Sequence, residues 1–238
     1  MKLSEYKSTL QWYLDHDPED FANISKLVNA RALTVANNES STVIPIPDLS
    51  GELDLAGKHI CLVIGHEPGG GARGEREWNI KVAKILAKKL EARGATVFIY
   101  FHKTRAYTTR CYEMRAGVKK HMPNADFVLL MHYNSMDDPS INGHHFQYYG
   151  AKAAAEFLRD AWQEEIPWSE ADRDNGIFHN TNSAGSLMLK LAPAWAVLTE
   201  PIFESNPEAR KKLITNPKGP ELVASSYDKG IGWFLLAS

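Results

Sequence analysis

The stretch HICLVIGHEPGGGARGEREWNIKVAKILAKKLEARG, residues 59–94, decides the fold class of this chain. Its beginning is a short apolar run closed by His66, which predicts a buried strand. A glycine-rich turn leads to a helix that begins at Glu75, carries an apolar stripe and stops at Gly94. A buried strand followed by such a helix is typical of a parallel sheet with helical crossover connections.

Strand and helix patterns continue to alternate from this stretch to the C-terminus. Residues 167–186 interrupt them with a polar segment rich in Gly and Asn, which we expect to be a long loop. Strands are predicted over 95–102, 126–132, 145–150, 187–191 and 195–200, and helices over 108–121, 151–165 and 220–237, with a short helix from Pro207.

These patterns predict an α/β fold with a mainly parallel (mixed) sheet and helices on both faces. Toward the N-terminus, two helical apolar stripes precede a linker broken by prolines. We therefore expect a helical N-terminal extension and linker over residues 1–57, and one larger domain over residues 58–238.

Composition narrows the class of protein. A hydrophobic share of 44% and a charged share of 24% suit a globular domain, and a net charge of −2 provides no general attraction for nucleic acid. No segment approaches the roughly 20 apolar residues that a membrane span needs. The N-terminus lacks the pattern of a cleaved signal peptide, so we expect a chain that is cytoplasmic as synthesised. Cys61 and Cys111 lie in apolar segments and are expected to be free, buried thiols.

Four side chains with metal and acid–base chemistry fall at element ends. His66, His132 and Glu200 close predicted strands, and Glu75 opens the helix after the first strand. In an open α/β sheet, ligands bind at the carboxyl ends of the strands. Two imidazoles and one carboxylate can hold Zn²⁺ and leave a position for water, while a second carboxylate can act as the base.

A competing motif lies in the same turn. Gly69, Gly71 and Gly74 have the G-x-G-x-x-G spacing of a dinucleotide-binding loop, and residues 102–105 could hold a 2′-phosphate. An NADP-dependent oxidoreductase is therefore an alternative. It is disfavoured because residues 65–68 separate the strand from the first glycine.

Longer strings around the four residues resemble the zinc-dependent N-acetylmuramoyl-L-alanine amidases of the type 3 family. The resemblance is carried by Gly65-His66, by Glu75 four residues before Asn79, by His132-Tyr133-Asn134, and by Glu200 with Phe203 and Asn206. It implies a hydrolase that cuts the amide between the lactyl group of N-acetylmuramic acid and L-alanine in peptidoglycan. It also implies Zn²⁺ as the cofactor, His66, Glu75 and His132 as its ligands, and Glu200 as the catalytic base.

Several neighbours depart from the family pattern. Glu67 stands where the family usually has glycine and could add a carboxylate to the metal loop, and Pro201-Ile202 replaces Leu-Gly. Met131 and Tyr133 replace smaller residues and are expected to reshape the substrate groove.

A few further residues could contribute to the site or support it. One of His144 and His145 can face the site, because successive strand residues point to opposite faces. His179 could contribute from the long loop, and Trp168 could stack on a sugar. Arg115 is expected to be structural.

Three function classes other than the amidase stay open. They are another zinc amidohydrolase or peptidase on the same scaffold, the NADP-dependent enzyme, and a non-catalytic wall-binding module. For an amidase, the expected setting is a phage-type lysin that reaches the wall after holin-type release. The sequence leaves the oligomeric state open.

Overall fold

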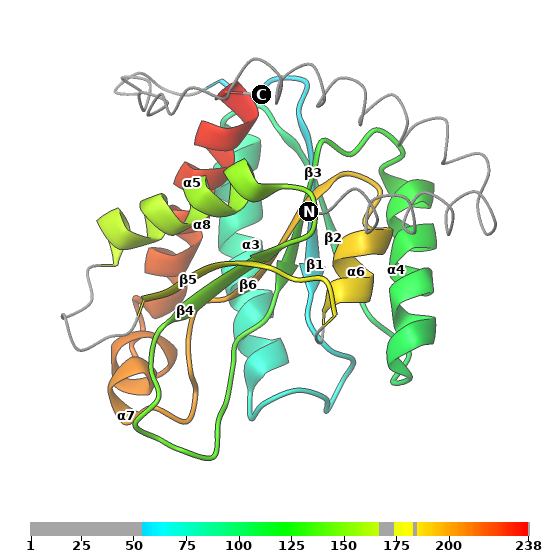
Figure 1. The fold of residues 1–238 in the computed structure, drawn as a ribbon. Helices are drawn as coiled ribbons and strands as arrows, with labels where there is room; N and C mark the ends of the chain where they lie inside the picture. The colour runs from blue at the N-terminus through cyan, green and yellow to red at the C-terminus, as the bar shows by residue number, and fades with distance from the viewer. Residues whose placement is uncertain (1–53, 167–173, 183–184, 238) are drawn as a thin grey trace, which may run out of the picture. The chain divides into compact units, whose positions relative to one another are not determined.

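A computed structural model describes residues 54–166, 174–182 and 185–237 of the 238-residue chain. Their centre is a six-stranded sheet with the strand order β2-β1-β3-β6-β4-β5 (Figure 1). The strands are β1 (His59–Ile64), β2 (Thr96–Phe101), β3 (Phe127–Met131), β4 (His144–Tyr148), β5 (Asp174–His179) and β6 (Trp195–Glu200).

The sheet is parallel except at one junction. β2, β1, β3 and β6 run parallel to one another, and β4 pairs parallel with β5. β4 runs antiparallel to β6, with His145 opposite Glu200. The predicted mainly parallel, mixed sheet is confirmed.

Helices cover both faces of the sheet, as predicted. α3 (Glu75–Ala92), α5 (Lys152–Glu165) and α8 (Gly219–Ala237) lie on one face, where α8 packs against both α3 and α5. α4 (Tyr107–His121) and α6 (Ser186–Leu191) pack together on the opposite face, apart from the first group in Figure 1. A short helix, α7 (Pro207–Ala209), is followed by a π-helical turn, η1 (Arg210–Ile214), before α8.

The core forms where the apolar runs predicted it. Every residue of β3 is buried, as are all but the first residue of β1, because helices lie over both faces of these strands. Leu55 is also fully buried, and its N–H donates to the Arg93 carbonyl, so the packed body already includes residue 55. Up to position 53, the predicted helical N-terminal extension lies outside the residues that the structure describes.

Two predictions around residues 167–191 are wrong. The expected loop contains β5, an edge strand that pairs only with β4 and whose sequence DNGIFH has no clear alternation of apolar residues. The apolar run 187–191, expected as a strand, lies in helix α6. Short apolar runs do not distinguish a strand from a buried helix, and Leu, Met and Lys are strong helix formers.

One smaller expectation agrees with the structure: Cys61 and Cys111 are buried and free. Within the described ranges, no helix combines the length and apolar character that crossing a membrane requires.

Candidate metal centre

The chain turns sharply after β1 to present His66. His66 has a φ of 61°, and it is the one residue other than glycine with positive φ in the described part of the chain. Such a conformation costs on the order of 1–3 kcal/mol and persists where the surroundings enforce it, typically at functional sites. The preceding Gly65 donates its N–H to the Met131 carbonyl, and a Cβ there would lie 2.6 Å from Nδ1 of His132. Glycine therefore lets the two histidine-bearing turns approach each other.

Glu75 begins α3 and is almost completely buried. Its Oε2 accepts a hydrogen bond of 2.9 Å from the Ala72 N–H, and its Oε1 accepts one of 3.2 Å from the Tyr133 N–H. Gly71 has a φ of 81°, and a Cβ there would lie 2.5 Å from Glu75 Oε2 and 2.6 Å from the His66 ring. The glycine-rich turn is thus closed around the carboxylate and the imidazole.

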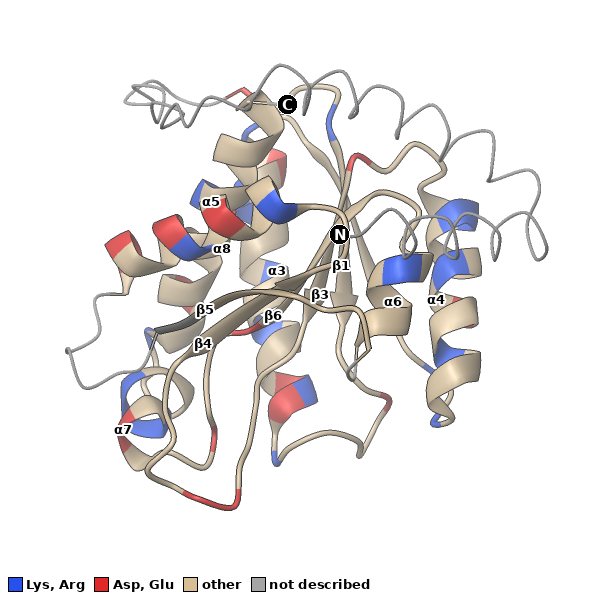
Figure 2. Ribbon diagram, in the orientation of Figure 1, with Lys and Arg blue, Asp and Glu red and all other residues tan. Residues whose placement is uncertain are grey.

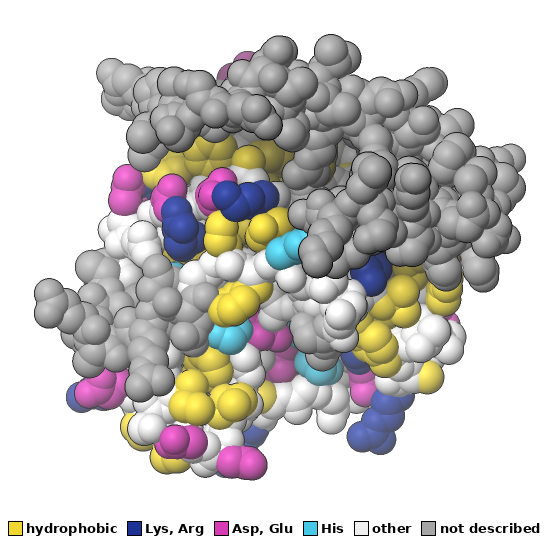
Figure 3. Space-filling model, viewed as in Figure 1, with side chains coloured by type: hydrophobic (Ala, Val, Ile, Leu, Met, Phe, Trp, Pro, Cys, Tyr) yellow, Lys and Arg dark blue, Asp and Glu magenta, His cyan; other side chains and the backbone are white. Residues whose placement is uncertain are grey.

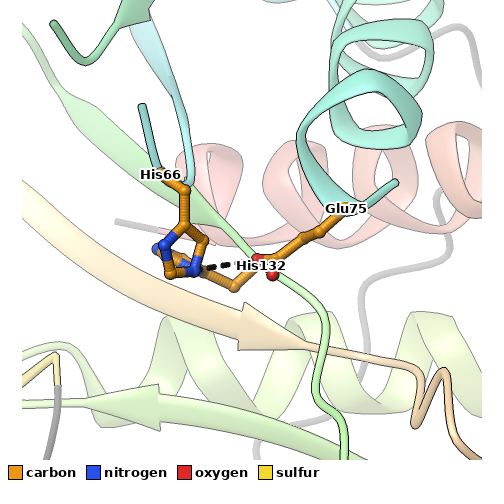
Figure 4. A group of neighbouring side chains, drawn as sticks. All are labelled: His66, Glu75 and His132. Atoms are coloured by element: carbon orange, nitrogen blue, oxygen red, sulfur yellow. Dashed lines mark hydrogen bonds and ion pairs between the residues drawn. The ribbon is translucent and has the colours of Figure 1, made fainter. Parts of the chain in front are cut away.

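Three ligand atoms converge between these elements (Figure 4). Glu75 Oε1 lies 3.1 Å from His132 Nδ1 and 3.4 Å from His66 Nε2. The three ligand atoms all lie within 4.8 Å of one another. Tetrahedral zinc with bonds of about 2.0–2.2 Å separates its ligand atoms by about 3.4 Å. The two distances from Glu75 Oε1 are close to this separation, so the three residues suit a zinc ion.

The environment favours the protonation states that bind metal. Burial lowers the pKa of His66, and the neighbouring His132 lowers it further. Burial acts to raise the pKa of Glu75, but its hydrogen bond from His132 and the charges of His132 and His66 outweigh this, and the pKa is lowered. Metal binding needs neutral imidazoles and an ionised carboxylate.

Glu200 ends β6 beside the strand that carries His132. The two chain segments are joined where the His132 N–H donates to the Thr199 carbonyl at 3.0 Å. Oε2 of Glu200 accepts hydrogen bonds from Asn134 Nδ2 at 3.0 Å and Gln147 Nε2 at 3.1 Å. Since both amides hold the same oxygen, the carboxylate has a defined orientation. It lies outside the three-residue metal cluster.

Strand β4 provides more of this site than the sequence analysis identified. His145 faces Glu200, with Nδ1 3.6 Å from Oε2, whereas His144 is buried against Trp162. The predicted alternation of the two histidines is confirmed. Gln147, two residues after His145 on the same face, was missed. Only the antiparallel pairing of β4 with β6 reveals that this face meets Glu200.

Gln147 is itself held in place. Its Oε1 accepts a hydrogen bond of 2.5 Å from Nδ2 of Asn180, and both residues are buried. This bond orients the amide so that Nε2, a donor, points to Glu200. Asn180 follows β5, inside the segment that was expected to be a loop, and no sequence signal marked it.

The departures from the family pattern have structural roles outside the metal cluster. Glu67 does not join the ligands; its Oε2 accepts a 2.6 Å hydrogen bond from Arg110, and Arg105 lies 3.6 Å from Oε1. The loop thus carries the extra carboxylate that was expected, and α4 supplies the guanidinium that binds it. Met131 and Tyr133 are buried rather than groove-lining, and the Tyr133 hydroxyl donates to the Arg73 carbonyl.

The secondary candidates are placed as follows. Pro201 directly follows the last residue of β6, as its extended preference favours. Arg115 is buried on α4. His179 lies on β5, where its ring stacks on Tyr148. Trp168 lies outside the described residues.

Comparison in sequence identifies one family. Residues 60–232 match the family model described as N-acetylmuramoyl-L-alanine amidase. This matched range contains all four predicted site residues. A comparison with curated proteins finds no match.

Solved structures of such enzymes share the fold. The chain is 21% identical to an N-acetylmuramoyl-L-alanine amidase from Clostridium difficile 630, with a TM-score of 0.62, covering 76% of this chain and 98% of that one. It is 20% identical to the amidase AmiC2 of Nostoc punctiforme, with a TM-score of 0.61 and coverages of 79% and 99%. It is 19% identical to the catalytic domain of the CD27L endolysin, which targets Clostridia difficile, with a TM-score of 0.60 and coverages of 73% and 96%.

Proposed function

Because this chain belongs to the N-acetylmuramoyl-L-alanine amidase family and is a peptidoglycan amidase, we propose that it works as a zinc enzyme, with His66, Glu75 and His132 as ligands and Glu200 as the catalytic base. The substrate bond is the amide between the lactyl group of N-acetylmuramic acid and L-alanine. The observation that carries the proposal is the convergence of Nε2 of His66, Oε1 of Glu75 and Nδ1 of His132.

The residues divide the chemistry between them. Zinc, when bound, would polarise the scissile carbonyl and make a coordinated water more acidic. Glu200 accepts the proton of the attacking water and passes it to the leaving amine of L-alanine. Asn134 and Gln147 hold Oε2 of Glu200, which leaves Oε1 for the proton.

The site supports an amidase better than the NADP-dependent alternative. In a dinucleotide-binding loop, backbone N–H groups face the pyrophosphate. Here the Ala72 N–H is bonded to the Glu75 carboxylate, and Gly71 lies against both Glu75 and His66. These close approaches account for Gly71. An intact set of ligands and base also argues against a module that only binds the wall.

One digest tests the proposal. Purified peptidoglycan is incubated with the full chain, with and without a chelator, and the products are identified by mass and by free amino groups. We expect stem peptides with a free L-alanine amine, no new reducing sugars, loss of activity with chelator, and recovery with zinc. Activity that persists after complete metal removal would refute the zinc mechanism.

We also infer a role in lysis, for which the likeness in fold to the CD27L endolysin domain is the supporting observation. An enzyme with this role reaches the wall after the membrane is permeabilised. Permeabilised cells of a susceptible bacterium should lose turbidity when the protein is added. A protein that digests purified peptidoglycan but leaves such cells intact would count against this role.

A further inference from the structure

Among the described helices, only those on one side of the sheet make principal contacts with β4 and β5. The principal helix contacts of both strands are with α5, on the side where Phe146 meets Trp162. On the opposite side, α4 packs on β2 and α6 on β6. His145 and Gln147 point to this second side, because they alternate with Phe146. Figure 3 shows hydrophobic and histidine side chains at the surface in this region.

An open pocket of about 420 Å³ lies on this face. Among its lining residues, Phe178 is 41% exposed, and its ring centroid lies 4.8 Å from that of His145. Amide and hydroxyl groups surround this aromatic ring. The other lining residues are Gln147, His179, Asn180, Thr181 and Asn182.

The pocket adjoins the proposed catalytic carboxylate. His145 and Gln147 both line the pocket and both approach Oε2 of Glu200, at 3.6 Å and 3.1 Å. A substrate whose scissile amide lies at Glu200 therefore places its next group in or near this pocket. The cleaved amide joins a sugar to a peptide, so the occupant is one of these two.

Charge distinguishes the two occupants. Among the described residues, those that line the pocket include no Asp, Glu, Lys or Arg, and β4 carries none along its length (Figure 2). The ammonium of Lys190 is engaged by the protein, since it donates to the Thr181 carbonyl at 2.8 Å and lies over the Tyr149 ring. A peptide stem carries carboxylates, which need cationic partners. Exposed Arg73, Lys103 and Arg105 lie instead on the turns after β1 and β2, at the other side of the metal cluster in the strand order. Those turns suit the acidic stem, and the uncharged pocket suits the sugar.

The chemistry of the lining also fits a sugar. An exposed aromatic ring packs against the apolar face of a pyranose, and buries area at little entropic cost. Asn and Gln side chains offer both donors and acceptors, which match sugar hydroxyls and acetamido groups. Gln147 is already committed to Glu200 and Asn180, so Asn182 and Thr181 at the rim are the available polar groups.

We propose that this pocket, with Phe178 as its stacking platform, is a carbohydrate subsite that holds an N-acetylated sugar of the glycan strand beside the cleaved bond. The proposal rests on the proposed reaction at Glu200, since that reaction places the sugar–peptide junction at the edge of the pocket.

The test uses a glycan that cannot be hydrolysed. Binding of a peptide-free tetrasaccharide of alternating N-acetylglucosamine and N-acetylmuramic acid to the full zinc-loaded chain is measured by calorimetry or NMR titration. We expect Phe178→Ala to raise the Kd about tenfold, the size of effect that loss of one aromatic contact gives. Asn182→Ala, at a second exposed position, should raise it severalfold. Tyr112→Ala, which removes an aromatic ring 44% exposed on α4 outside the pocket, is the matched control and should not change it.

Two results would overturn the subsite. One is a tetrasaccharide that fails to bind, or that binds Phe178→Ala and Asn182→Ala as tightly as the unaltered chain. The other is a Phe178→Ala variant that loses affinity for a free stem peptide instead, which would assign the pocket to the peptide. Because the tetrasaccharide has no stem amide, its binding does not depend on hydrolysis. A chain that binds it but releases no L-alanine amine from peptidoglycan would refute the proposed function and leave the subsite intact.

Discussion

Nε2 of Gln147 donates a hydrogen bond of 3.1 Å to Oε2 of Glu200, across the only antiparallel strand pair that the described sheet contains. The Asn180 amide fixes which end of Gln147 faces the carboxylate. If Glu200 is the base, as proposed, Gln147 is a positioning residue that acts through the orientation of that carboxylate.

Replacing Gln147 should impair catalysis more than binding. Hydrogen bonds to charged groups are worth about 1.5–3 kcal/mol, so Gln147→Leu should lower kcat by about 10- to 100-fold. Zinc content and KM should change little. Gln163→Leu, at an exposed position on α5, provides the control and should behave as the unaltered enzyme. Equal loss of kcat and zinc would show that Gln147 supports the metal cluster instead.

Variants of the proposed base and of a proposed ligand should differ in zinc content. Glu200→Ala should retain about one zinc per chain and lose at least ~100-fold in activity, the usual contribution of general acid–base catalysis. Glu75→Gln should lose zinc, because it removes the charge that the two histidines face. Metal analysis beside the peptidoglycan assay checks both. An active Glu200→Ala enzyme would disprove the assignment of the base.

Alanine substitutions at two glycines of one turn provide a matched comparison. Gly69 and Gly71 have φ values of 78° and 81°, so alanine is strained at both, by about 1 kcal/mol. A Cβ at Gly69 would have no neighbour within 4 Å, whereas one at Gly71 would lie 2.5 Å from Glu75 Oε2. We expect Gly71→Ala alone to weaken zinc binding, measured by competition with a chromogenic chelator. Similar zinc affinity in the two variants would contradict this account.

The buried pair of Glu67 and Arg110 should matter for stability. Both side chains are 9% exposed. Arg110→Met leaves the buried carboxylate with only the exposed Arg105 as a charged neighbour and should lower the free energy of unfolding by up to about 3–5 kcal/mol. The double variant Glu67→Gln, Arg110→Met should recover part of this loss. Arg105→Met removes an 88% exposed partner and should cost less than about 1 kcal/mol in urea unfolding.

His102 should make the folded state sensitive to acid. Burial, followed by the charge of Arg110, lowers its pKa to about 3. Both ring nitrogens are buried without a hydrogen-bond partner among the described residues. Below a pH of about 6.5, the unfolded chain binds a proton at His102 that the folded chain excludes. Stability should therefore fall by up to about 1.4 kcal/mol per pH unit as pH decreases from about 6.5 toward 3.

Urea unfolding between pH 7 and pH 4, with chelator present throughout, measures this contribution. His102→Gln should flatten the acid side of the stability profile relative to the unaltered chain. Parallel profiles for the two proteins would show that His102 becomes protonated without cost to the fold.

The local sequence pattern was sufficient for most of the elements and for the ends that carry the site. Buried parallel strands appear as continuous apolar runs, so His66, His132 and Glu200 could be recognised at strand ends before any pairing was known. The periodic spacing of apolar residues predicted helix α3, with Glu75 in its first turn. The edge strand β5 was not predicted, because this strand is paired on one side only and its sequence has no strong apolar pattern.

By itself, therefore, the sequence determined the α/β class, the burial of the central strands and the four residues of the candidate centre. Tertiary structure alone decided the partners: that Glu67 binds Arg110, 43 residues away, and that Gln147 binds Glu200, 53 residues away. The physical reason is that periodicity and turn chemistry act over a few neighbouring residues. Strand order and direction, by contrast, depend on contacts between distant segments, and the reversal at β4 decided which side chains surround the Glu200 carboxylate.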